Sequence, residues 1–159
     1  HIGGLADFPH ATVHVGREEY EHYMSGSPRY LKIPLQHNPD IKTYEPSDRL
    51  WFGLEARKVA TALDVEMLLI PLPGHTFGHC GIAIKNGDKW LFYVADAYYL
   101  REELSDMDHP VHELAEMRAD DNKLRIDTLE KIRRLMQDHP EIEIFGYHDI
   151  SEFEYYNSK

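Results

Sequence analysis

The stretch PLPGHTFGHCG, residues 71–81, decides how this chain is interpreted. It follows the apolar run MLLI at 67–70, which predicts a buried strand ending at a Pro-Gly turn. His75 and His79 lie on that glycine-rich turn, where the backbone can approach another group closely. A single histidine at a strand end is more often a hydrogen-bonded loop residue than a ligand. The rest of the chain must therefore decide between these two interpretations.

Two later stretches also consist of an apolar run followed by a candidate metal ligand. Asp96 ends the apolar run FYVA at 92–95, and His148 ends the run IFGY at 144–147. A carboxylate buried without a partner is costly, and neutral imidazoles together with a carboxylate are ligands that zinc selects. Asp96 has a second interpretation, as the N-cap of a helix that starts at Ala97. The joint occurrence of the three stretches favours a metal site.

The composition predicts one globular domain, residues 1–159, because 42% of the 159 residues are hydrophobic. The 28 acidic and 17 basic residues give a net charge of −11, which argues against nucleic acid or an anionic membrane as a partner. The longest apolar runs are too short to span a bilayer. The single cysteine fits a reducing compartment, so a cytoplasmic location is expected. A secretory signal would precede His1, where this sequence does not test it.

Strands followed by a helix and one more strand indicate a layered α/β or α+β domain. Apolar residues at helical spacing predict an amphipathic helix over 120–138. Asn86-Gly87-Asp88 is a hairpin signal. Four prolines and little periodicity predict a long irregular connection over 25–48. The other expected elements are a strand at 11–15, a helix at 17–24, strands in 55–60, 65–72 and 80–96, and a last strand in 141–149.

The three histidine and aspartate stretches together resemble the metallo-β-lactamase fold hydrolases. In that family a first motif H-x-H-x-D-H precedes P-G-H-T-x-G-H, an aspartate at an A-D or G-D strand end, and a histidine after a C-terminal strand. PGHTFGH at 73–79, VADA at 94–97 and GYHD at 146–149 match the last three elements in order. The resemblance implies an αββα sandwich.

The first four residues, HIGG, resemble the end of the family's first motif. By this interpretation His1 is a metal ligand, and the preceding H-x-H-x-D and the first strands of the sandwich lie outside this chain. The other interpretation makes His1 a terminal or tag-derived residue.

The resemblance also implies roles for individual residues at a centre of two metal ions. His75 would bind one ion, His1 and His148 the other, and Asp96 would bridge both. Zinc is the expected metal, with iron or manganese as alternatives. In the lactonases of this family, a tyrosine three residues after the aspartate donates to the substrate carbonyl, so Tyr99 joins Asp96 as a candidate catalytic residue. A packed or interface aromatic is the competing interpretation of Tyr99.

The function implied is metal-dependent hydrolysis of an ester, lactone, thioester or amide of a small molecule by metal-bound hydroxide. The alternative is a non-catalytic binding or assembly module with this fold and an incomplete metal site. The chain without the first motif is expected to be impaired as a catalyst, and an open sheet edge would favour association with a second copy. His79 is expected either to orient the turn or to be a loop residue, and the histidines outside these motifs are predicted to lie at the surface.

Overall fold

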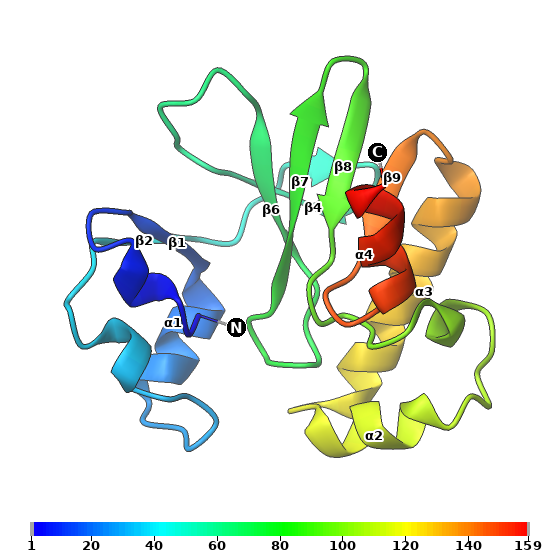
Figure 1. The fold of residues 1–159 in the computed structure, drawn as a ribbon, viewed down its shortest axis with the longest axis horizontal. Helices are drawn as coiled ribbons and strands as arrows, with labels where there is room; N and C mark the ends of the chain where they lie inside the picture. Colours follow the sequence, from blue (N-terminus) through cyan, green and yellow to red (C-terminus); the bar gives the residue numbers. More distant parts are fainter. Residues whose placement is uncertain (1, 159) are drawn as a thin grey trace.

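A five-stranded mixed sheet forms the centre of the computed structural model, which describes residues 2–158 (Figure 1). Its strand order is β5-β6-β7-β8-β9, antiparallel from β5 to β8, with β9 parallel to β8. The strands are β5 (Arg57–Lys58), β6 (Met67–Pro71), β7 (Cys80–Asn86), β8 (Lys89–Tyr93) and β9 (Ile142–Phe145).

The strand directions bring three strand ends together. Both β6 and β8 pair antiparallel with β7, and β9 runs parallel to β8, so β6, β8 and β9 all point the same way. The segments that leave these strands after Pro71, Tyr93 and Phe145 therefore begin at the same end of the sheet. This is the topology that the candidate site requires.

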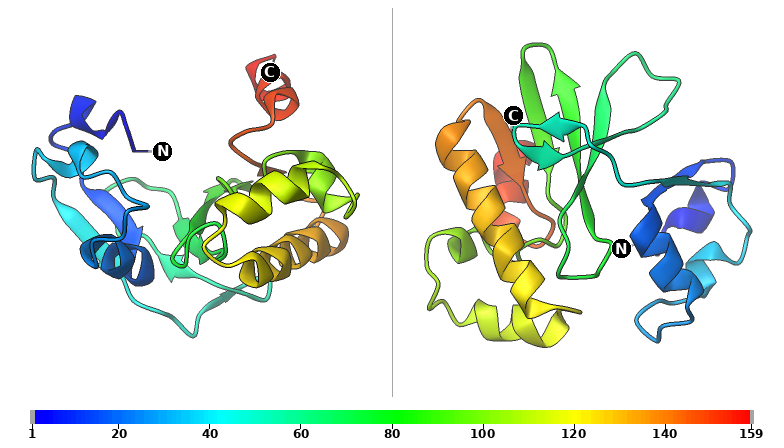
Figure 2. Two further views of the ribbon diagram at one scale, coloured as in Figure 1. Left: turned by 90° about the horizontal axis from the view of Figure 1, so that it is seen from below. Right: turned by 180° about the vertical axis from the view of Figure 1, so that it is seen from behind.

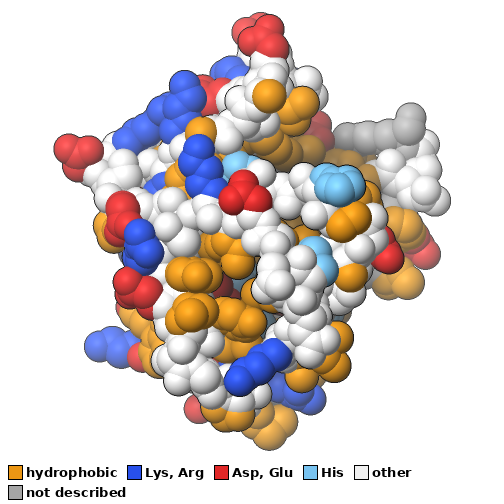
Figure 3. Space-filling view, turned by 90° about the vertical axis from the view of Figure 1, so that its left-hand side faces the viewer, with side chains coloured by type: hydrophobic (Ala, Val, Ile, Leu, Met, Phe, Trp, Pro, Cys, Tyr) orange, Lys and Arg blue, Asp and Glu red, His pale blue; other side chains and the backbone are white. Residues whose placement is uncertain are grey.

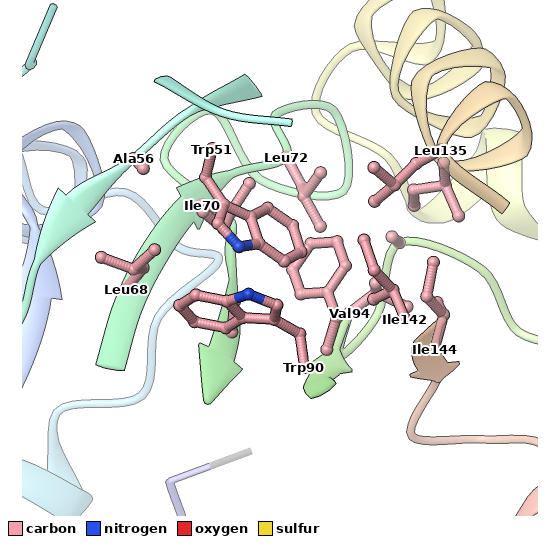
Figure 4. Packing of buried hydrophobic residues seen from close by; sticks show 14 of the residues in the cluster. Trp51, Ala56, Leu68, Ile70, Leu72, Trp90, Val94, Leu135, Ile142 and Ile144 are labelled. Atoms are coloured by element: carbon pink, nitrogen blue, oxygen red, sulfur yellow. The ribbon is translucent and has the colours of Figure 1, made fainter. Parts of the chain in front are cut away.

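The core lies between one face of this sheet and the long helix α3 (Asn122–Asp138). Burial alternates along β8, where Trp90 and Phe92 point into the core. Trp51 packs edge-on against both rings, at centroid distances of 5.4 and 5.0 Å (Figure 4). Burial of an apolar side chain of this kind contributes roughly 1.5–3 kcal/mol to stability. The side chains of α3 that complete the core are Leu129, Ile132 and Leu135.

The opposite face of the sheet is only partly covered. Helix α4 (Ile150–Asn157) lies on that side, away from α3 (Figure 2), and its Tyr156 contacts Phe145 of β9 at a ring distance of 4.8 Å. Ile84 and Leu91, paired neighbours on β7 and β8, remain half-buried there. This face is therefore apolar without being fully enclosed.

The N-terminal part lies beside the sheet (Figures 1 and 2) and contains β1 (Val13–Gly16), α1 (Arg17–Met24) and β2 (Ile41–Tyr44). Buried Arg57 of β5 attaches it, because its guanidinium binds both carboxylate oxygens of Glu18 at 2.6 and 2.7 Å. Figure 3 shows the side of the molecule on which this N-terminal part lies. Hydrophobic side chains lie between the charged side chains on that surface.

The remaining elements are short. They are η1 (Leu5–Asp7), η2 (Ile33–Leu35), β3 (Leu50–Trp51), β4 (Leu54–Glu55), η3 (Arg101–Leu104) and α2 (Val111–Arg118). No helix within residues 2–158 is long and apolar enough to cross a membrane.

The mixed α/β architecture is confirmed, together with the predicted hairpin, whose Gly87 has a φ of 59°. The irregular connection predicted over 25–48 is wrong in part, because β2 lies inside it and pairs in parallel with β1. The strand predicted in 55–60 is reduced to the two-residue pieces β4 and β5. The sequence did not predict α2 or α4, whose apolar residues show no clear helical period.

Candidate metal centre

The structure brings His75, Asp96 and His148 together at the common end of β6, β8 and β9. Nε2 of His75 lies 3.5 Å from Oδ2 of Asp96, and Nε2 of His148 lies 3.2 Å from Oδ1. Each oxygen of the carboxylate thus faces a different imidazole. The arrangement is two half-sites that share one carboxylate. His1, the other predicted ligand, lies outside the described residues.

Asp96 is placed by an unusual backbone conformation at the end of β8. The preceding Ala95 has a φ of 50°, in the left-handed region that is costly for a residue with a side chain. Its carbonyl accepts a hydrogen bond from the N–H of Tyr147 at 3.0 Å, which ties this turn to the segment after β9. No helix begins at Ala97, so the interpretation of Asp96 as a helix cap is wrong. Backbone strain of this kind concentrates at functional sites.

His79 uses both ring nitrogens to hold the backbone around the site. Its Nδ1 lies 2.9 Å from the carbonyl of Leu72, and its Nε2 accepts a hydrogen bond from the N–H of Asp96 at 3.2 Å. Because a carbonyl can only accept, Nδ1 carries the proton and the ring is neutral. Burial favours this form by lowering the pKa of His79. The residue therefore positions Asp96, with no nitrogen left to bind a metal.

Replacing His79 with leucine tests this positioning role. The change leaves the Leu72 carbonyl and the Asp96 N–H without their partner, so the free energy of unfolding should fall by about 1–3 kcal/mol. Metal affinity should fall by roughly 10–100-fold, as when a group that orients a ligand is lost. Urea unfolding and metal titration would measure the two effects, with the exposed His10→Leu variant as control. Unchanged metal affinity in His79→Leu would contradict the role.

The loop that carries His75 is packed against elements on both sides. A Cβ added to Gly78 would lie 2.0 Å from the backbone nitrogen of Glu19 in α1, so only glycine fits there. The hydroxyl of Thr76 donates to the same Glu19 carboxylate at 2.7 Å. The carbonyl of His75 accepts from the N–H of Asp120, just before α3. The glycines and threonine of the motif thus serve packing around the histidine.

His75 is held in the protonation state that a metal ligand needs. Burial lowers its pKa to about 4, so the ring is neutral at neutral pH. Nη2 of Arg29 lies 3.2 Å from Nε2, and because a guanidinium only donates, Nε2 presents its lone pair. The Arg29 guanidinium therefore lies next to Nε2 of His75, the nitrogen that a metal ion would bind.

The buried histidines predict a loss of stability in mild acid. The unfolded chain titrates histidine near 6.5, whereas the folded-state pKa of His75 is about 4 and that of His79 is also lowered. Between these values the unfolded state binds more protons, so the free energy of unfolding should decrease as the pH falls from about 6.5 to about 4. Urea unfolding at several pH values would measure the slope. It should become shallower in His75→Gln and stay unchanged in His10→Gln; equal slopes in all three proteins would contradict the assignment.

Tyr99 lies beside both half-sites. Its ring centroid is 4.8 Å from that of His148 and 6.2 Å from that of His75. Burial raises the pKa of its phenol, which therefore stays protonated and able to donate. Its backbone N–H donates to Oε1 of the fully buried Glu103 at 2.7 Å, and Arg125 of α3 pairs with that carboxylate at 3.0 Å.

Sequence analysis did not identify Glu103 or Arg125. Arg125 lies inside the helix predicted over 120–138, and no element was predicted around Glu103. The prediction that histidines outside the motifs are surface residues is wrong for His112, whose side chain is 13% exposed and whose Nδ1 lies 3.7 Å from Glu103.

Another buried carboxylate, Glu152 of α4, fixes the segment that carries His148. It accepts hydrogen bonds from the hydroxyl of Tyr98 at 2.9 Å and from the N–H of Gly146 at 2.7 Å, and it pairs with Arg101. The neighbouring Asp149 accepts from the N–H groups of Ser151 and Arg101, both at 2.9 Å, and caps α4. Both carboxylate oxygens of Asp149 thus accept backbone hydrogen bonds that hold α4 and the Arg101 segment, although the residue is next to His148 in the sequence.

The donors fit a metal centre in chemical type. Neutral imidazoles and a buried carboxylate are zinc ligands, and Asp96 meets one imidazole at each oxygen, as a carboxylate bridging two ions would. Within residues 2–158 no group of three or more His, Cys, Asp or Glu side chains could by itself hold a metal ion. Each half-site would therefore need further ligands.

A mixed α/β fold with these donors at one end of its sheet is typical of metal-dependent hydrolases. The chain belongs to the metallo-beta-lactamase superfamily, whose family model matches residues 1–147. The resemblance drawn from PGHTFGH, VADA and GYHD is thereby confirmed.

Among relatives, a probable metallo-hydrolase of Mycobacterium tuberculosis is 33% identical over 106 residues, which are 64% of this chain and 34% of that protein. An N-acyl homoserine lactone hydrolase with N-hexanoyl-L-homoserine at its catalytic metal centre has a TM-score of 0.68 at 21% identity, over 97% of this chain and 53% of that one. A dizinc quorum-quenching lactonase has a TM-score of 0.63 at 19% identity, over 94% and 53%. The chain thus spans about a third to a half of the length of these proteins.

Proposed function

We propose that this chain carries part of the active site of a metal-dependent hydrolase, with two zinc ions, that acts on a small-molecule ester or lactone. The observation that carries the proposal is the Asp96 carboxylate with one imidazole at each oxygen. His75 would hold one ion, His148 the other, and Asp96 both. The lactone hydrolases of similar fold support the substrate class; thioesters and amides are the further substrates to assay.

The chain's own residues would orient the reaction as follows. Bound metal ions would lower the pKa of a water molecule and polarise the carbonyl of the substrate. His79 keeps Asp96 in place through the backbone, and Glu103 keeps Tyr99 in place in the same way. The protonated phenol of Tyr99 would donate a hydrogen bond to the carbonyl oxygen as negative charge develops on it.

The test uses the full-length protein that contains this chain. Metal content is measured after purification, after chelation and after zinc is restored, and hydrolysis of N-hexanoyl-homoserine lactone and 4-nitrophenyl acetate is followed in each state. Activity that disappears on chelation and returns with zinc supports the proposal. Equal activity without metal overturns it, and metal binding without hydrolysis of any ester, lactone, thioester or amide indicates the non-catalytic module instead.

The Tyr99→Phe variant separates the phenol from the ring. The aromatic packing against His148 remains, whereas the donor is lost, so kcat should fall by roughly 10–100-fold at nearly unchanged metal content. Steady-state kinetics on the lactone and metal analysis would measure both. Tyr155→Phe is the matched control, because this tyrosine lies in α4 and is 54% exposed. A kcat equal to that of the unmodified protein would show that Tyr99 only packs.

A further inference from the structure

A cleft of about 530 Å³ opens beside the candidate centre. Three of its lining residues, His75, Tyr99 and His148, belong to the centre itself. The other three are Arg29 from the N-terminal part and Leu114 and Arg118 from α2. The charged side chains that line this cleft, next to the candidate centre, are thus two arginines and no carboxylate.

The charge of this cleft is opposite to that of the chain. The whole sequence has 28 acidic against 17 basic residues, a net charge of −11. Arginine is the only charged residue type in the lining. Because the Asp120 carboxylate balances Arg29 and the Asp96 carboxylate lies against His75 and His148, the uncompensated positive charge of the cleft is that of Arg118. An uncompensated positive charge attracts anions and disfavours cations within a Debye length.

Arg29 holds the cleft together. Its guanidinium donates to the carbonyl of Arg118 at 2.5 Å and to the carbonyl of His75 at 2.9 Å. It also lies 3.6 Å from the carboxylate of Asp120, which balances its charge. These contacts fix the end of α2 next to the loop that carries His75. Arg29 is accordingly a positioning residue for this wall of the cleft.

Arg118 is the group available for a ligand. It is exposed, and no ion pair joins its guanidinium to a carboxylate anywhere in residues 2–158. Its positive charge reaches Tyr99, since it acts to lower the pKa of that phenol against the larger effect of burial. Leu114, four residues earlier in α2, lies on the same side of the helix and gives the cleft an apolar patch beside this charge.

We propose that this cleft binds an anionic group of the substrate, a carboxylate or a phosphate, with Arg118 as its partner and Leu114 against the adjoining apolar carbons. The planar guanidinium matches either anion through two parallel hydrogen bonds. The inference rests on the proposed hydrolase and deepens it, because it restricts the substrate to an ester or lactone that carries a negative charge near the scissile bond.

A binding experiment tests the cleft independently of catalysis. Succinate, inorganic phosphate and neutral 1,4-butanediol are titrated into the full-length protein and followed by NMR or calorimetry. We expect one of the two anions to bind, the diol not to bind, and Arg118→Ala to weaken the anion by roughly 10–100-fold, as for loss of a charged hydrogen bond. Arg118→Lys should restore part of the affinity. Arg134→Ala, at a 73% exposed arginine of α3, is the control. Equal binding in Arg118→Ala and the unmodified protein overturns the inference.

A kinetic experiment completes the test. The monoester of succinate with 4-nitrophenol is compared with the same ester whose free carboxylate is capped by methyl. In the unmodified protein the charged ester should have the higher kcat/KM, and Arg118→Ala should lower the ratio of the two values by roughly 10–100-fold, through KM. A ratio unmoved by Arg118→Ala overturns the inference. Anion binding lost in Arg118→Ala, with neither ester hydrolysed, would confirm the cleft and count against the hydrolase instead.

Discussion

Replacing Asp96 with alanine is expected to abolish metal retention by the full-length protein and, with it, all metal-dependent hydrolysis. The Asp96 carboxylate faces both half-sites, through Oδ2 toward His75 and Oδ1 toward His148. In the proposed site, loss of the carboxylate would remove a ligand from each ion and leave their mutual repulsion uncompensated. Metal affinity should fall by well over 100-fold, beyond the range seen for residues that only orient ligands.

Two further variants make this prediction specific. Asp96→Asn keeps the shape and the backbone hydrogen bond to His79 but removes the charge, so it should fold normally and still lose metal. Asp88→Ala, at an exposed aspartate of the β7–β8 hairpin, should retain metal fully. Metal analysis after dialysis and thermal unfolding would be measured on all three. Two ions held by Asp96→Ala at normal affinity would show that the carboxylate does not bridge.

The location of the candidate site was predictable because it follows from strand direction and local pattern. Each of His75, Asp96 and His148 comes a few residues after an apolar run, and the runs became strands with a common direction. A buried strand followed by a turn places its next polar residues at the end of a sheet. The three positions therefore depend on local sequence signals and on one topological fact, the parallel pairing of β9 with β8.

The support around the site was not predictable, because it depends on contacts between distant segments. Glu103 has nothing in its local sequence to mark it as fully buried, yet it holds the Tyr99 backbone and pairs with Arg125 across 22 positions. Glu152 likewise joins Tyr98 to the segment before His148. Buried charges are satisfied by tertiary partners, and no periodicity reveals such partners.

These two carboxylates explain how loops can hold a site that requires accurate placement. Glu103 joins the segment after β8 to α3, and Glu152 joins the same segment to the one after β9. The loop carrying His75 is joined to the start of α3 through the N–H groups of Asp120 and Asp121. The three segments are thus linked to one another as well as to the sheet. A substitution that breaks one of these contacts should therefore move all three segments.

Replacing Gly74 with alanine provides such a disturbance, and we expect it to lower the free energy of unfolding by about 3–5 kcal/mol, in the range reserved for severe packing changes. Gly74 has a φ of 133°, and a Cβ there would lie 2.3 Å from the backbone nitrogen of Arg125 and 2.4 Å from its Cα. No rotamer change can relieve an overlap with backbone, so the start of α3 or the loop must move. Either movement disturbs His75 beside it and the Arg125–Glu103 ion pair.

Gly87→Ala separates the overlap from the cost of the backbone conformation. Gly87 also has a positive φ, 59°, but an added Cβ there meets nothing within 4 Å. Its replacement should cost only about 1 kcal/mol, the price of the left-handed conformation. Urea unfolding of both variants would give the difference that belongs to the overlap, and metal affinity should fall in Gly74→Ala alone. If Gly74→Ala and Gly87→Ala lowered the free energy of unfolding equally, the His75 loop and α3 would be able to move apart at no cost. The two elements would then not be rigidly linked.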